Sequence, residues 1–245
     1  MKVITVKTRP IIAGDKLLEI LNKYVKEVKN KTVIAITSKI ISICEGRVVE
    51  IGKADKDKLI REESELYLPP DKKYNFSLTI KNNVMIASSG IDESNGNGYY
   101  VLWPEDPQKS ANKIREYLVK RFKVKSVGVI IVDSKTTPLR WGVTGVAIAH
   151  SGFEALNNYI GTPDIFGRLF KVEKVNVADG LAASAVLAMG EGREQTPVAI
   201  IEDVPFVHFQ KRNPTKKELE ELHIPMKDDL YYELLKNVKW KKGGK

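Results

Sequence analysis

A chain of 245 residues, of which 42% are hydrophobic and 29% charged, is long enough to bury a sizeable core and has an ordinary globular composition. No apolar run approaches the roughly 20 residues that a membrane-spanning helix needs, and residues 1–10 lack the apolar centre of a signal peptide. The single cysteine, Cys44, excludes an internal disulfide. We expect an inert buried thiol and a cytoplasmic protein.

The formal net charge of +9 is compatible with nucleic acid, nucleotides or acidic substrates as binding partners. Much of the excess lies near the C-terminus, where lysine and glutamate mix at helical spacing, which is typical of a solvated helix face. Nucleic-acid binding is therefore not the favoured interpretation. We expect residues 206–245 to form a basic helical extension, packed on or following a domain of residues 1–205. Its last segment, KWKKGGK at 239–245, is expected to fray.

The chain alternates strand-like and helix-like segments, with no internal repeat and no low-complexity linker. In the first part of the chain the patterns predict a strand at 1–8, a helix at 14–28, a strand at 32–37 and a helix or turn at 38–47. They then predict a strand at 84–88, a helix at 106–122, a strand at 126–133, a helix at 176–190 and a strand at 196–203. The continuous apolar runs among the strands indicate burial on both faces. The prediction is an α+β fold with a mixed sheet.

Residues at the ends of the predicted helices are of the types that cap helices. Asp15 and Asp106 are expected as N-caps, and Pro107 then takes the first helical position. Gly190 is expected to end the helix that begins near residue 176.

Two aspartates follow apolar strand-like runs in the same way. Asp92 comes after residues 84–91, among small residues and with no evident salt-bridge partner, and Asp133 comes after residues 126–132. Binding groups often stand at the C-terminal ends of strands. Two carboxylates meeting there would repel each other unless a divalent cation lay between them, and Ser134 would add a hydroxyl ligand. The alternative is that both aspartates simply cap turns.

A glycine-rich turn follows the last predicted helix, where Gly190 and Gly192 flank Glu191. Glycines let backbone N–H groups approach phosphate oxygens, and Glu191 is suited to a cation that bridges them. The alternative is an ordinary helix C-cap. The chain has neither a P-loop motif nor a G-x-G-x-x-G after a strand, so any nucleotide binds in an uncommon way.

The remaining polar residues exclude some chemistry. His150, His208 and His223 show neither metal-ligand spacing nor a catalytic triad pattern, which argues against hydrolysis by an activated nucleophile. Arg140 offers a guanidinium fork suited to phosphate or carboxylate, although it equally suits a plain surface position.

Six blocks of the sequence occur in a characteristic order: TSKIISICEGR, SGIDESNG, VLWPEDPQKSANKIREYL, VGVIIVDSKTTPLRWGVTGVAIAHSGF, NYIGTPDIFGR and VADGLAASAVLAMGEG. In this order they resemble the CofE-type family, whose members are ligases that add L-glutamate to the precursor of the deazaflavin coenzyme F420. The resemblance runs from about Val3 to Val204. Its GID-x-SN and VAD-x-LA…MGEG motifs are quite specific to that family.

The resemblance implies a GTP-dependent amide ligase that uses divalent metal, with a mixed-sheet α+β fold and an intertwined homodimer. By matching motifs, it implies metal ligands at Asp92, Asp133, Ser134 and Glu191. It implies nucleotide contacts at Arg9, Pro10, Ile11, Ile12, Ser38, Lys39, Asn95, Met189, Gly190 and Gly192. Arg140 would neutralise an acyl phosphate or hold a glutamate carboxylate. The expected cofactors are two Mg²⁺ or Mn²⁺ ions, with GTP or ATP as the co-substrate.

The chain departs from the family pattern at two cationic positions. Ile43 stands where the family carries a lysine, and Trp141 stands where it carries an arginine. The segment DSKTTPLRWGVTG at 133–145, together with EQTPVAIIED at 194–203, resembles a divergent branch associated with gamma-glutamate ligases of folate metabolism. An indole suits a flat and less anionic acceptor, which predicts weak glutamylation of the deazaflavin precursor. The alternative is that Trp141 packs inside the dimer.

The acceptor therefore stays open between a deazaflavin, a folate-like molecule and a peptide. Two rival functions are also open. One is a non-catalytic, basic RNA- or ribosome-associated protein on a ligase-like scaffold, and the other is a different metal-dependent phosphoryl transferase. The RNA interpretation is weakened because no recognised RNA-binding motif interleaves exposed aromatic and basic residues.

Overall fold

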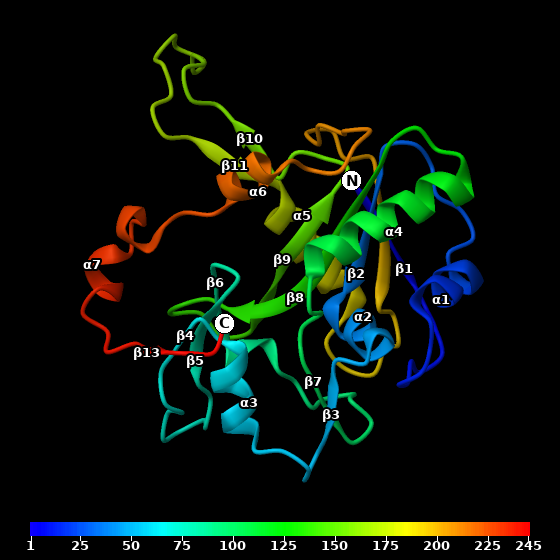
Figure 1. The fold of residues 1–245 in the computed structure, drawn as a ribbon. Coiled ribbons are helices and arrows are strands. Elements are labelled where there is room, and N and C mark those ends of the chain that lie inside the picture. Colours follow the sequence, from blue (N-terminus) through cyan, green and yellow to red (C-terminus); the bar gives the residue numbers. More distant parts are fainter.

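The computed structural model describes residues 1–245, and its centre is a five-stranded mixed sheet (Figure 1). The strand order is β1-β12-β2-β8-β9. The bounds are β1 (Lys2–Val6), β2 (Thr32–Thr37), β8 (Val127–Thr136), β9 (Val143–Ser151) and β12 (Val198–Glu202). The pair β2–β8 is parallel and the other three pairs are antiparallel. The predicted α+β class with a mixed sheet is confirmed.

Helices cover both faces of this sheet. On one face lie α1 (Leu17–Tyr24), α2 (Ser38–Glu45) and α4 (Pro107–Phe122), and on the other lies α5 (Val177–Met189). The side chains of β2 alternate between the two layers, with Ile34 and Ile36 in the first core and Val33 and Ala35 in the second. The apolar run of β2 is thus buried on both faces, as its sequence predicts.

Smaller elements surround the central sheet. A second sheet has the order β13-β4-β5-β6. The bounds are β3 (Val48–Glu50), α3 (Lys56–Glu63), β4 (Leu66–Tyr67), β5 (Leu78–Lys81), β6 (Val84–Ala87), η1 (Ser88–Gly90), β7 (Tyr99–Val101), β10 (Leu156–Asn158), β11 (Lys174–Asn176), α6 (Lys216–Leu222), η2 (Met226–Asp228), α7 (Tyr232–Leu235) and β13 (Lys241–Lys242). The expected strand at 84–88 therefore exists as β6, outside the central sheet.

The expected helix ends are partly confirmed. Asp106 caps α4 by accepting a hydrogen bond from the Lys109 N–H at 2.8 Å, and Gly190 follows the last residue of α5. The prediction for Asp15 is wrong, because Lys16 is the N-cap of α1. The Asp15 carboxylate instead accepts from the Ile12 N–H and from Arg9, so a charged partner nearby outcompetes the capping role.

The expectation of a frayed C-terminus is also wrong. Residues 241–242 form β13 and pair antiparallel with β4, so that Lys241 lies beside Tyr67. In Figure 1 the chain swings outward through α7 and returns to the body at this strand. Backbone pairing with a distant strand, which local composition does not encode, orders the segment. Among the helices, none combines the length and apolar character that crossing a bilayer requires.

His150 gives the fold a specific dependence on pH. Its ring is 2% exposed and packs edge-on against Phe153, and burial lowers its pKa from 6.5 to about 4. The unfolded chain therefore binds a proton more readily than the folded chain between pH 6.5 and pH 4. Stability present above this window is lost as pH falls through it, by about 3 kcal/mol for this group alone.

We expect denaturant titrations to show this loss in the wild type and to show a smaller loss in His150→Gln. The comparison isolates the imidazole from carboxylates that titrate in the same range. An identical pH dependence in the two proteins would contradict the assignment.

Candidate active site

A cavity of about 470 Å³ opens where the parallel strands β2 and β8 end. Its wall is built from the β1–α1 loop, the start of α2, the 92–97 loop, residues 132–134 of β8, and the end of α5 with the turn that follows. The carboxyl edge of parallel strands commonly presents binding groups. Here five segments that are far apart in sequence converge on one such edge.

Most residues singled out from the sequence line this cavity. They are Arg9, Pro10, Ile11, Ile12, Lys39, Asp92, Asn95, Asp133, Ser134, Met189, Gly190, Glu191 and Gly192. Two do not line it. Ser38 is buried at the first position of α2, and Arg140 lies in the exposed turn between β8 and β9.

Asp92 has a salt-bridge partner that its sequence neighbourhood does not show. Lys39 Nζ lies 2.6 Å from Asp92 Oδ2, and the Ser94 N–H and hydroxyl donate to the same carboxylate. Burial works to raise the pKa of Asp92, but the bonds from Lys39 and Ser94 outweigh it and lower the pKa below its ordinary value. The expectation of an aspartate without an ionic partner is therefore wrong.

Asp133 lies within β8, which continues through Thr136, three residues beyond the predicted end of the strand at 133. Its carboxylate accepts hydrogen bonds from the Ser134 N–H at 2.8 Å and from the indole N–H of Trp103. Loss of hydration raises the pKa of Asp133 to about 6, and the nearby charge of Asp92 acts in the same direction. The site therefore presents a carboxylate whose negative charge is poorly compensated.

Glu191 reaches the same region from the turn after α5. The Ser134 hydroxyl lies 3.5 Å from Glu191 Oε2, and partial desolvation raises the pKa of Glu191 above its ordinary value. Asn95 Nδ2 donates to the Gly192 carbonyl at 2.9 Å, which ties the 92–97 loop to the glycine-rich turn. The Gly192 N–H donates to Glu194 Oε2 at 2.8 Å. The Gly192 N–H, which would suit a phosphate oxygen, therefore donates to the long side chain of Glu194 in this structure.

The β1–α1 loop completes the opposite wall. Arg9 forms two short hydrogen bonds with Asp15, at 2.7 and 2.6 Å, and its side chain is 46% exposed. The Thr8 N–H donates to the Gln195 carbonyl at 2.8 Å, which joins this loop to the glycine-rich turn. The guanidinium is preorganised at the cavity mouth and suits a phosphate or carboxylate.

The donor set of the cavity fits a divalent cation that shares its ligands with a phosphate chain. Asp92, Asp133 and Glu191 line one cavity, yet no group of three such side chains comes close enough to hold an ion by itself. Magnesium is typically held by one or two carboxylates, with water and substrate phosphates as the other ligands. The arrangement matches that pattern and does not match a closed all-protein metal cage.

Several contributors to the cavity were missed from the sequence. They are Thr8, Thr37, Asn97, Arg193, Glu194, Gln195 and Thr196 in the wall, and Trp103 behind Asp133. Those after Gly192 lie in the same turn as a predicted residue, and proximity in sequence would have found them. Trp103 is 30 residues away from Asp133, and no local pattern marks that contact.

Comparison with known proteins identifies a family to which the chain is similar. Residues 5–203 match the family model described as F420-0:Gamma-glutamyl ligase. The chain is 36% identical over 219 residues to the coenzyme F420:L-glutamate ligase of a Methanococcus maripaludis strain, covering 80% of this chain and 86% of that protein.

It is 34% identical over 242 residues to the protein of the same name from Methanopyrus kandleri, covering 90% of this chain and 88% of the relative. It is also 34% identical over 239 residues to that from Methanocaldococcus jannaschii, covering 87% and 93%. These matches and the resemblance carried by the six sequence blocks agree, and the chain belongs to the F420-0:gamma-glutamyl ligase family.

Proposed function

We propose that the protein is a nucleotide- and divalent-metal-dependent ligase that joins L-glutamate to a carboxylate of a coenzyme F420-type acceptor. One observation carries the proposal. Asp92, Asp133 and Glu191 line a single cavity together with Lys39 and a glycine-rich turn, in a chain of this ligase family. The family supports glutamate ligation, and the cavity chemistry supports a phosphorylated co-substrate.

Amide formation from a carboxylate needs activation. In the proposed reaction the γ-phosphoryl group of the nucleotide moves to an acceptor carboxylate oxygen, giving an acyl phosphate and the nucleoside diphosphate. The neutral amine of glutamate then attacks the acyl carbon. The phosphate leaves with the bonding electrons, the amine loses a proton, and an amide remains. Binding in one cavity would favour these steps by holding the separate reactants in line.

The residues of the chain would divide the work of binding. Lys39 would shift from Asp92 to phosphate oxygens, and the Gly192 N–H would exchange Glu194 for a phosphate oxygen. Asp92, Asp133, Ser134 and Glu191 would hold one or two Mg²⁺ or Mn²⁺ ions, which offset phosphate charge when bound. Arg9 would steer anionic substrates at the mouth. The cavity wall carries the carboxylates of Asp92, Asp133, Glu191 and Glu194 beside the cationic groups of Arg9, Lys39 and Arg193, so bound cations would reduce the repulsion of a triphosphate by these carboxylates.

The acceptor is proposed from the family and from its relatives, because Arg140 and Trp141, which were expected to face the acceptor, do not line the cavity. Trp141 is 94% exposed, and it lies with Arg140 outside the cavity wall. Ile43 lines the cavity, so an apolar surface stands where the family resemblance implies a lysine. Weak use of the deazaflavin precursor stays a prediction, and a parallel assay with a folate-like acceptor and Trp141→Arg tests it.

The test of the proposal is incubation with GTP or ATP, Mg²⁺ or Mn²⁺, L-glutamate and each acceptor, followed by mass spectrometry. The expected product carries the mass of one or more added glutamate residues and needs all components. Phosphoryl transfer or nucleotide hydrolysis without any amide would instead support another phosphoryl transferase. Binding of RNA without turnover would favour the non-catalytic alternative.

We also propose that the protein is a homodimer joined through the β10–β11 hairpin. The loop between these strands extends away from the body (Figure 1). At its tip Ile165 is 91% exposed and Phe166 is 89% exposed, with Leu169 and Val172 also exposed nearby. A contiguous exposed apolar segment of this kind indicates an interaction surface, and the family resemblance supplies a second copy as its occupant.

Ile165→Glu combined with Phe166→Glu is expected to convert the dimer to a monomer at micromolar concentration, because each change places a charge in an apolar contact. Light scattering after size-exclusion chromatography measures the mass. Leu230→Glu is the matched control, since Leu230 is 88% exposed and lies outside the hairpin. A wild type that is monomeric, or a double variant that stays dimeric, would refute this interface.

A further inference from the structure

Trp103 connects the loop that carries Asp92 to strand β8, which carries Asp133. Its side chain is 1% exposed, and its indole N–H donates to Asp133. Two residues before it, Val101 pairs with Asp92 through backbone hydrogen bonds of 2.7 and 3.1 Å. Gly90 packs so closely on the indole that a β-carbon there would overlap the ring. The Trp103 side chain therefore bonds to Asp133 and packs on Gly90, two residues before Asp92.

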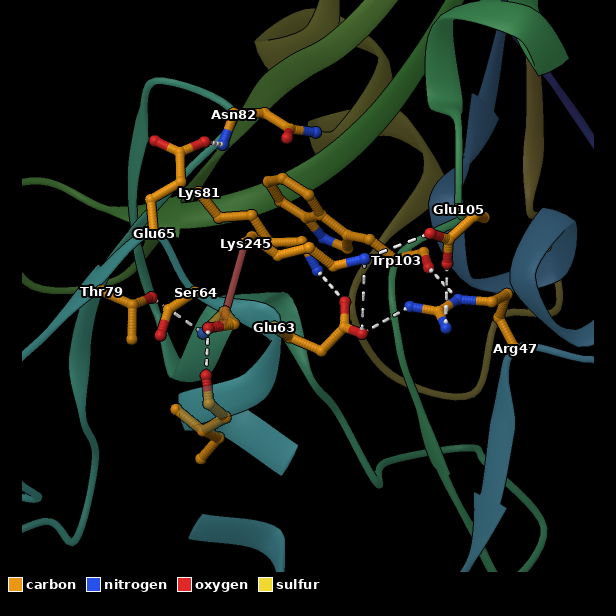
Figure 2. A network of polar contacts seen from close by, with 12 residues as sticks. Arg47, Glu63, Ser64, Glu65, Thr79, Lys81, Asn82, Trp103, Glu105 and Lys245 are labelled. Carbon is orange, nitrogen blue, oxygen red and sulfur yellow. Dashed lines mark hydrogen bonds and ion pairs between the residues drawn. The ribbon is translucent and has the colours of Figure 1, made fainter. Parts of the chain in front are cut away.

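A buried cluster of charges fixes Trp103 from behind (Figure 2). Lys81 Nζ lies 5.3 Å from the centre of the indole ring and forms a 2.7 Å ion pair with Glu63. Arg47 pairs with the other oxygen of Glu63 at 2.8 Å, and its Nε donates to the Trp103 carbonyl at 3.1 Å. Lys81 and Glu63 are 5% and 7% exposed. Such a cluster keeps its geometry only while water is excluded.

Residues 243–245 close this cluster and are called the docked tail. The N–H groups of Gly243, Gly244 and Lys245 donate to carbonyls of residues 65, 61 and 64, at 2.9, 3.0 and 3.1 Å. A β-carbon on Gly243 would overlap the Ser64 carbonyl, so only glycine fits there. Lys245 Nζ reaches Glu105 at 3.1 Å and lies 4.0 Å from Glu63.

The tail thus bonds through its backbone to the turn after α3, and through its ammonium group to two carboxylates of the cluster. Arg47 lies 3.1 Å from the same Glu105, so Arg47, Glu63, Lys245 and Glu105 form a ring of ion pairs that adjoins Trp103 through Arg47. Figure 2 shows Lys245 pointing into this ring beside the indole. Without the tail, water would reach Glu63, and the side chains that pack on Trp103 would gain freedom.

We propose that Trp103 is a positioning residue for Asp133 and that the docked tail is the element that keeps Trp103 in place. The inference rests on the proposed function for the role of Asp133 in turnover. The claim that the docked tail holds Trp103 in place rests on structural contacts alone. In this scheme the C-terminal segment controls the reaction rate from behind the cavity, without touching a substrate.

Two readouts test the proposal. The first is the ¹⁵N–H spectrum of the three indoles, Trp103, Trp141 and Trp240, with Trp103→Phe used to assign the buried one. The second is the kcat and KM of the ligase assay. Variants Gly243→Ala, Lys245→Ala and a deletion of residues 243–245 disturb the tail. Lys242→Ala is the matched control, because it removes an exposed charge from the same segment.

We expect the tail variants to shift the Trp103 indole signal and to lower kcat about 10-fold, with KM for nucleotide changed little. Trp103→Phe, which keeps an aromatic side chain but loses the indole N–H donor, should lower kcat by about 10- to 100-fold. Lys242→Ala should match the wild type in both readouts, and Lys245→Arg should restore most of what Lys245→Ala loses.

Unchanged indole signals in the deletion variant would overturn the proposal, whether or not the wild type has ligase activity. A shifted Trp103 signal with unchanged kcat in an active enzyme would refute the role in catalysis. If the wild type shows no ligase activity, the proposed function fails, and the indole spectrum still decides whether the tail positions Trp103.

Discussion

Asp133→Asn is expected to reduce ligase turnover by about 100- to 1,000-fold at saturating metal and nucleotide, while lowering the free energy of unfolding by no more than about 1–3 kcal/mol. Asparagine has nearly the same shape, but its single amide oxygen can accept only one of the two bonds that Trp103 and the Ser134 N–H donate to the two oxygens of Asp133. It lacks the negative charge that the proposed cation needs. Because poor hydration disfavours the ionised carboxylate, removal of its charge offsets part of the cost of the lost hydrogen bond.

Steady-state kinetics and denaturant unfolding of the same preparation check both halves of this expectation. Asp71→Asn is the control, because the Asp71 carboxylate accepts backbone bonds in an exposed turn far from the cavity wall. Turnover within a factor of about three of the wild type in Asp133→Asn would remove this carboxylate from the mechanism and weaken the metal assignment with it.

Glu63→Ala is expected to destabilise the protein by about 3–5 kcal/mol, the largest single effect on the free energy of unfolding that we anticipate. Glu63 is the shared partner of Arg47 and Lys81, at 2.8 and 2.7 Å. Its removal leaves the buried Lys81 ammonium without an ionic partner. The cost arises from this uncompensated charge more than from the lost pair itself.

The neighbouring residue supplies the control for this measurement. Glu62 pairs with Lys58 at 3.8 Å with both side chains more than half exposed, so Glu62→Ala should change the free energy of unfolding by less than about 0.5 kcal/mol. Equilibrium denaturation of the two variants gives the difference directly. Equal effects of the two substitutions would show that the Glu63 cluster remains open to water.

The sequence alone determined the elements whose cause is local. The continuous apolar run of β2 and the Asp106-Pro107 start of α4 were placed correctly, because burial on two faces and helix capping act through neighbours in the chain. The sequence blocks also identified the residues that line the cavity, through resemblance to a family. Composition and periodicity by themselves left Asp92 and Asp133 open between metal ligands and turn caps.

Only the tertiary structure decided the partners of those residues. Lys39 meets Asp92 across 53 positions, and Trp103 meets Asp133 across 30, because loops from two different sheets converge on one edge. The same packing leaves Arg140 outside the cavity and orders the glycine-rich tail against β4. Local sequence patterns do not predict such long-range contacts, because the contacts depend on how whole layers pack and on which charged groups are buried together.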